Sequence, residues 1–95
     1  MVENFKKITL KAVPILKKHN VIKAGIFGSF ARGDFNKKSD VDFLVRFRGK
    51  KSLLDLIRLK NDLEASLHKE VDILTYKSIH PLLKNKILKE EIKIV

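Results

Sequence analysis

Residues 28–45 read GSFARGDFNKKSDVDFLV and join a glycine-containing turn to two aspartates, Asp40 and Asp42. An apolar run over 21–27 precedes the turn, and a second one over 41–47 begins between the aspartates, so both runs are predicted to be buried strands. Residues i and i+2 of a strand project from the same face. Asp40 and Asp42 are therefore expected to point together into the space that the turn lines.

The turn has the composition of an anion-binding loop. Gly28 would let the backbone approach a ligand closely, and Ser29 offers a hydroxyl and an N–H donor. A short helix over 29–33 would present its amino end to a phosphate, although a plain strand-to-helix turn uses the same residues. Arg32 could contact a phosphate or pair outward with Asp34, and the sequence leaves both open.

Two carboxylates on one face beside such a turn suit a divalent cation that carries a nucleoside triphosphate. Gly28 and Ser29, followed after residues 30–39 by Asp40 and Asp42, resemble the signature of the DNA polymerase beta-type nucleotidyltransferases, in particular the small minimal nucleotidyltransferases. The resemblance implies an α+β, polymerase beta palm-like fold with a mixed three- to four-stranded sheet and helices packed mainly on one face. The length of 95 residues predicts a single domain over 1–95.

The resemblance calls for a third carboxylate on a later strand, and Asp72 in the segment 70–75 stands at that place. An ordinary solvent-facing strand residue would look the same, and Glu70 on the same face is the rival candidate. On the family pattern, two Mg²⁺ ions are held by Asp40, Asp42 and Asp72. Asp72 would also help to deprotonate the acceptor hydroxyl. The alternative for the first two is a solvated loop–strand junction.

The reaction that the resemblance implies is attack of an acceptor hydroxyl on the α-phosphate of ATP, with pyrophosphate leaving. The residues assigned to ATP binding are Gly28, Ser29, Arg32 and Ser39. Ser39 would hold the acidic pair in place. Minimal nucleotidyltransferases of this size are typically antitoxins that transfer AMP to a tyrosine of a HEPN-family ribonuclease toxin. The resemblance therefore implies a protein adenylyltransferase in a hetero-oligomer with that toxin.

Two other functions stay open at this level. A non-catalytic antitoxin module could neutralise the toxin by binding alone, and the intact carboxylate set argues against it. Nucleotidyl transfer to a small molecule or an RNA end is the other alternative. A chain of 95 residues has no room for a separate acceptor-binding domain, which argues against that one. No motif marks the base preference, the modified residue or the stoichiometry.

Basic residues outnumber acidic ones by 21 to 11, which gives a formal net charge of +10. Such a balance suits a polyanionic partner, or it reflects lysine-rich, solubilising helix faces. The densest basic cluster is Arg46, Arg48, Lys50 and Lys51. It could steer a triphosphate or an acidic partner. No aromatic side chains expected to be exposed are interleaved with it, so a direct nucleic-acid target is poorly supported.

Cysteine is absent, which excludes disulfides, thiolate catalysis and zinc–thiolate sites. No apolar run approaches the roughly 20 residues of a membrane span. The amino terminus also lacks the layout of a signal peptide. A cytoplasmic location without membrane attachment is the resulting expectation.

Three longer helices are expected, over 3–19, 52–67 and 78–90. Pro14 should kink the first or make it restart, and Ser52 with Asp55 resembles a capping box at the start of the second. The predicted buried side chains of the second helix are Leu53, Leu56, Leu59, Leu63 and Leu67. Residues 92–95 suggest a short edge strand, and Tyr76 is expected at the rim of the core.

Overall fold

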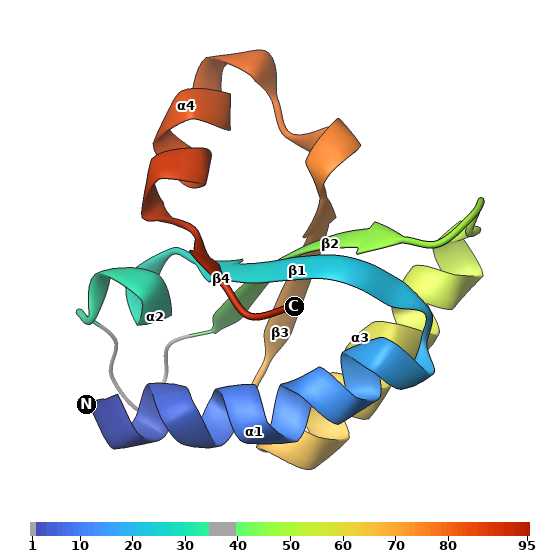
Figure 1. The fold of residues 1–95 in the computed structure, drawn as a ribbon, viewed down its shortest axis with the longest axis horizontal. Coiled ribbons are helices and arrows are strands. Elements are labelled where there is room, and N and C mark those ends of the chain that lie inside the picture. The colour runs from blue at the N-terminus through green and yellow to red at the C-terminus, as the bar shows by residue number, and fades with distance from the viewer. Residues whose placement is uncertain (1, 35–39) are drawn as a thin grey trace.

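The computed structural model describes residues 2–34 and 40–95 (Figure 1). The elements, in chain order, are α1 (Val2–Lys18), β1 (Val21–Phe27), α2 (Ser29–Arg32), β2 (Val41–Phe47), α3 (Leu53–Leu67), β3 (Val71–Thr75), the 3-10 turn η1 (Tyr76–Ser78), α4 (Pro81–Glu90) and β4 (Ile92–Lys93). Among the helices described here, none has the length and apolar character to span a bilayer. The mixture of helices and strands confirms the predicted α+β class.

The four strands form one mixed sheet in the order β3-β2-β1-β4. β1 is antiparallel to β2 and β4, whereas β2 is parallel to β3. Parallel neighbours need a crossover connection, and α3 provides it. The register places Asp42 opposite both Phe27 of β1 and Asp72 of β3. The end of β1 and the beginnings of β2 and β3 therefore meet at one edge of the sheet.

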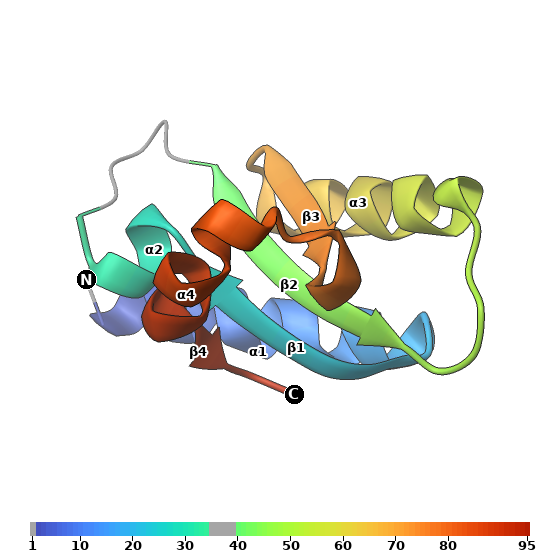
Figure 2. The same cartoon turned by 90° about the horizontal axis from the view of Figure 1, so that it is seen from above.

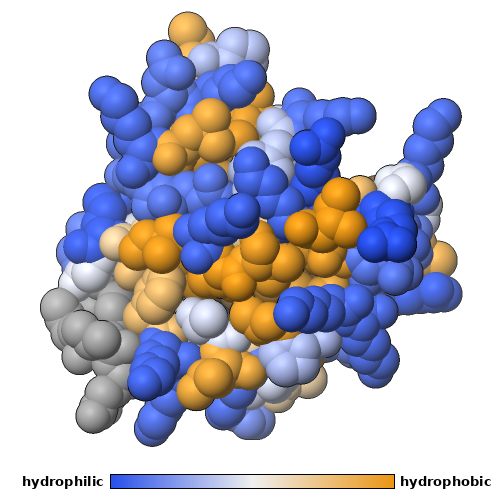
Figure 3. Space-filling model, in the orientation of Figure 1, coloured by the Kyte–Doolittle hydropathy of each residue, from blue (hydrophilic) through white to orange (hydrophobic). Residues whose placement is uncertain are grey.

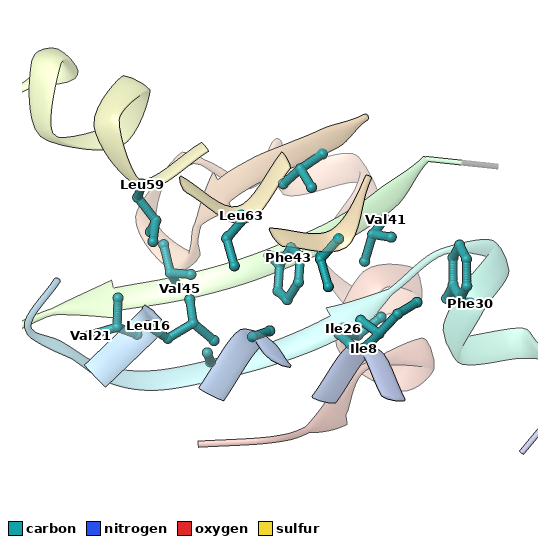
Figure 4. Packing of buried hydrophobic residues seen from close by; sticks show 14 residues of the cluster. Ile8, Leu16, Val21, Ile26, Phe30, Val41, Phe43, Val45, Leu59 and Leu63 are labelled. Atoms are coloured by element: carbon teal, nitrogen blue, oxygen red, sulfur yellow. The ribbon is translucent and has the colours of Figure 1, made fainter. Parts of the chain in front are cut away.

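The two long helices, α1 and α3, cover one face of the sheet, while η1 and α4 lie on its other side (Figure 1, Figure 2). Along β2, Val41, Phe43 and Val45 are fully buried in the core (Figure 4). The two helices contribute Ile8, Ala12, Leu16, Leu59, Leu63 and Leu67. Because side chains alternate along a strand, Asp42 and Arg46 lie on the opposite face. The expected packing of helices mainly on one face is confirmed.

The helices match the predictions with three exceptions. α1 runs through Pro14 without interruption, so the expected restart is wrong. The proline removes a hydrogen bond to the carbonyl of Leu10, and Leu10 is well exposed, so water can satisfy that carbonyl. The last helix begins at Pro81 rather than near Ser78, because residues 76–78 form η1 and His80 caps α4 by accepting the Leu82 N–H.

The third exception is Leu53 of α3. Ser52 and Asp55 do form the predicted capping box, and Leu59, Leu63 and Leu67 are buried, but Leu53 is 72% exposed. Figure 2 shows that the start of α3 extends past the end of β3, so its first turn lies beyond that strand. The predicted edge strand is confirmed as β4, which pairs with β1.

Candidate active site

Gly28 directly follows β1 and has a backbone conformation that essentially only glycine adopts. Its φ is 76° and its ψ is −151°. A Cβ atom at this position would also overlap the Oδ2 atom of Asp42. Both the path of the chain and the close approach of the turn to Asp42 therefore require glycine.

The short helix α2 starts directly after Gly28. The Arg32 N–H donates to the Gly28 carbonyl at 3.0 Å, and the Gly33 N–H donates to the Ser29 carbonyl at 2.9 Å. Gly33 ends the helix in the left-handed region, and the buried Phe30 fixes it to the core (Figure 4). The first N–H groups of a helix have no partner within it. The amino end of α2 therefore offers donors at the sheet edge that carries Asp42.

Asp42 is the electrostatic centre of this edge. It is half-buried, and its pKa is raised to about 6, first by burial and then by the charges of Asp72 and Asp40. The Arg32 guanidinium acts in the opposite direction. Mutual repulsion of this kind requires carboxylates that lie near one another. The register places Asp72 opposite Asp42, and Asp40 precedes Asp42 by two residues; Asp40 is half-buried and Asp72 is exposed.

The donor set at this edge fits a divalent cation such as Mg²⁺. Such cations prefer carboxylate oxygens, and a cation would offset the repulsion that raises the pKa of Asp42. As the side chains stand within the described part of the chain, no group of three His, Cys, Asp or Glu residues is already close enough to hold a metal ion. The residues that fit are Asp40, Asp42 and Asp72.

Arg32 pairs with two carboxylates. Its Nε donates to Asp34 and its Nη1 to Glu90 at the end of α4, each at 3.1 Å. These hydrogen bonds raise the pKa of Arg32 further above its ordinary value. Of the two roles that the sequence left open, the outward pairing with Asp34 is therefore present. The contact with Glu90 was not predicted, and no local signal could have revealed it, because 58 positions separate the residues.

Ser39 and Glu70 are the remaining candidates. Ser39 lies outside the described residues. Glu70, the rival of Asp72, is exposed and precedes β3, and its carbonyl accepts the Val41 N–H at 3.0 Å. Asp72, by contrast, stands directly opposite Asp42 in the parallel register. The register favours Asp72 over Glu70 as the third carboxylate.

Tyr76 lies half-buried beside the sheet, as expected for the rim of the core. Its hydroxyl donates to the Glu91 carboxylate, and the Lys23 ammonium stands 4.6 Å from its ring centre. Burial and then Glu91 raise the pKa of Tyr76 above its ordinary value. The Glu91 side chain also occupies the space that a Cβ on Gly25 would need. This network ties the end of α4 to β1.

Comparison with known proteins identifies the family. Residues 10–95 match the family described as Polymerase beta, Nucleotidyltransferase, and the chain belongs to that family. A Methanocaldococcus jannaschii protein with the provisional name protein adenylyltransferase MJ0435 is 55% identical over 92 residues, which cover 97% of this chain and 99% of that protein. Protein adenylyltransferase MntA of Thermococcus cleftensis is 33% identical over 87 residues, which cover 92% and 88%.

Solved structures agree with the fold. One that is provisionally described as a minimal nucleotidyltransferase superposes with a TM-score of 0.82 at 34% identity, covering 95% of this chain and 92% of that one. A chain from the structure of tri-AMPylated Shewanella oneidensis HEPN toxin in complex with MNT antitoxin gives 0.75 at 16% identity, covering 96% and 71%. At that identity the likeness concerns the fold alone. The predicted nucleotidyltransferase fold and family are confirmed.

Proposed function

We propose that residues 1–95 form one nucleotidyltransferase domain that moves AMP from ATP to a tyrosine hydroxyl of a HEPN-family toxin in the cytoplasm. The observation that carries the proposal is the position of Asp42, which adjoins the Gly28 turn and lies opposite Asp72. Support for a protein acceptor comes from the two relatives named as protein adenylyltransferases. The HEPN toxin of the Shewanella complex suggests the kind of partner.

The proposed ATP site uses the turn after β1. The phosphates would accept hydrogen bonds from the amino end of α2 and from the Ser29 hydroxyl, with Gly28 allowing the backbone to approach them. Arg32 would add a charged donor once it leaves Glu90. We further propose that Ser39 holds Asp40 in place beside the phosphates.

In the proposed reaction, the acceptor oxygen forms a bond to the α-phosphorus while the bond from that phosphorus to the bridging oxygen breaks. Pyrophosphate leaves with the electron pair, and Asp72 takes the hydroxyl proton. When bound by Asp40, Asp42 and Asp72, Mg²⁺ neutralises charge on the phosphates. The protein's own contribution is to hold the acceptor and the triphosphate in line.

A hetero-oligomer with the toxin has support from the surface. The face in Figure 3 carries an apolar strip across its middle, where β1 and β4 lie in Figure 1, with hydrophilic side chains on both sides. Ile22 of β1 and Ile92 of β4 are both exposed. Contiguous apolar surface of this kind is typical of contact sites between proteins.

The test is intact-mass analysis of the HEPN protein that co-purifies with this chain, after incubation with ATP and Mg²⁺. We expect an added AMP group on the partner. The Asp42→Asn variant should abolish it. The Asp62→Asn variant is the matched control, since Asp62 is an exposed residue of α3 bonded to His19, and it should leave the modification intact.

The other outcomes separate the alternatives. A partner that stays unmodified in an intact wild-type complex would refute the transferase proposal and favour neutralisation by binding alone. Transfer of labelled nucleotide to RNA, with no protein present, would replace the protein acceptor by an RNA end.

A further inference from the structure

A groove of about 940 Å³ lies between the β2–α3 connection and the segment formed by η1 and α4. Its apolar lining includes Phe47, Leu56, Ile79 and Leu88. Its basic lining residues are Lys23, Arg46, Lys50, Lys51, Lys77 and Lys84. Among the residues that the structure describes, no acidic one lines it. The groove thus combines an apolar surface with six positive charges, and the reaction described above uses none of them.

The groove is separate from the phosphate-binding turn. Its lining includes Val45 and Thr75, which are paired in the same parallel register that pairs Asp42 with Asp72. Both lie three residues farther along their strands, which is about 10 Å. The Gly28 turn adjoins Asp42 at the opposite end of β2. Along β2, the acidic cluster therefore lies between the Gly28 turn and the groove.

Within residues 2–34 and 40–95, no ion pair involves the basic residues of the groove. The ion pairs found in these ranges belong to His19 and Arg32. The charge of Lys51 contributes to the lowered pKa of Asp55, after the hydrogen bond from the Ser52 backbone, but Asp55 does not line the groove. A concave surface with one sign of charge concentrates the opposite charge. An anionic occupant is thus favoured.

The apolar lining indicates what kind of anion fits. α4 has no buried side chain, and Leu88, which lines the groove, is 38% exposed. Single-stranded nucleic acid needs aromatic platforms for its bases. The groove has two aromatic residues: Phe47 is half-buried and Tyr76 is already held by Glu91 and Lys23. A peptide with acidic and apolar side chains fits this lining better than a nucleic acid does.

We propose that this groove docks an acidic, partly apolar segment of the protein that receives AMP. The inference rests on the proposed function, because it assigns the groove to the acceptor protein. The distance of about 10 Å to the carboxylates corresponds to roughly three residues of extended chain. The docked segment should therefore lie about three residues or more from the tyrosine that is modified. Docking of this kind selects the acceptor without taking part in the chemistry.

The test uses a fluorescent random copolymer of glutamate and tyrosine as the probe, with fluorescence anisotropy as the readout. Lys50→Glu combined with Lys51→Glu should weaken binding about tenfold, a difference of about 1.4 kcal/mol. Both residues are exposed just before the Ser52 cap, where acidic residues favour the following helix, so folding should be preserved. The matched control, Lys6→Glu with Lys7→Glu on α1, changes the net charge equally. It should change binding less than twofold.

Three results would overturn the proposal. Equal weakening by both pairs of substitutions would mean that net charge alone attracts the copolymer. Binding of an oligouridylate in preference to the copolymer would assign the groove to nucleic acid. If the Lys50 and Lys51 changes leave AMP transfer to the HEPN partner unaffected, the groove has no role in docking. Because the anisotropy assay contains no ATP, groove-dependent binding without any AMP transfer would refute the proposed reaction and not the groove.

Discussion

The two ends of β2 differ both in charge and in the way they are built. At one end, backbone geometry places Asp42 against Gly28 and opposite Asp72. At the other, the basic groove is assembled from side chains of β1, β2 and its following turn, η1 and α4. One atom added at the acidic end should therefore sharply lower the rate of AMP transfer. Changes in charge at the basic end should instead weaken binding gradually.

The sharpest test of this contrast is Gly28→Ala. The added Cβ would overlap Asp42 and impose a strained φ of 76°. Displacement of reacting groups by about 1 Å can cost 10²-fold in rate, so we expect AMP transfer to fall at least that far. Rates are measured with the HEPN partner, and thermal unfolding shows whether the variant is folded.

Gly33→Ala is the matched control for this substitution. Gly33 also has a positive φ, 83°, but nothing lies within 4 Å of the added Cβ. It should lose about 1 kcal/mol of stability through backbone strain and keep most of its activity. Similar activities for the two variants would show that closeness to Asp42 does not matter.

The same contrast explains what could be predicted from the sequence. A local pattern contains the Gly28 turn, the strand that follows it, and the pair of Asp40 and Asp42. It can be read from the sequence because alternation along a strand fixes which side chains share a face. The groove has no such pattern. Lys23 and Lys84, which both line it, belong to β1 and α4 and meet only in the folded chain.

Contacts between distant elements were missed for the same reason. Nothing local to Arg32 or Glu90 specifies that α4 ends beside α2. The prediction that Leu53 is buried was wrong, because helical spacing describes a face of α3 but not how far the sheet beneath it extends.

In the absence of metal, the carboxylates at the acidic end should lower the free energy of unfolding of the protein. Because Asp42 is half-buried beside two carboxylates, its pKa is raised to about 6. Since water screens such a group, we expect Asp42→Asn to increase the free energy of unfolding of the metal-free protein by about 1 kcal/mol at neutral pH. The gain should vanish as the pH falls from about 6 towards 3.8, because the wild-type carboxyl then becomes neutral as well.

Urea unfolding with and without Mg²⁺ measures this effect. Adding Mg²⁺ should stabilise the wild-type protein and have little effect on Asp42→Asn, because a ligand stabilises only the state that binds it. A variant that is less stable than the wild-type protein at neutral pH without metal would contradict the account of the repelling carboxylates.

Tyr76→Phe tests whether the network of Tyr76, Glu91 and Lys23, which ties the end of α4 to β1, is structural. The substitution removes the hydroxyl that donates to Glu91 and keeps the ring beneath Lys23. We expect a loss of about 1 kcal/mol in the free energy of unfolding, because Glu91 is half-buried and loses its donor. AMP transfer to the partner should be unchanged. An unchanged free energy of unfolding in the variant would contradict a structural role for the Tyr76 hydroxyl.

The smallest expected effect concerns the link between α4 and the phosphate turn. Arg32 can reach a phosphate only by leaving its carboxylate partners, so Glu90→Gln should tighten ATP binding about two- to threefold, as measured by titration calorimetry. Asp34→Asn removes the other partner and is the comparison variant. Its effect should be smaller, because the Asp34 side chain is 60% exposed against 18% for Glu90, and water screens it more strongly. If neither substitution changes the affinity, Arg32 does not contact the phosphates. Triphosphate recognition at the acidic end would then depend on the Gly28 turn and the carboxylates alone.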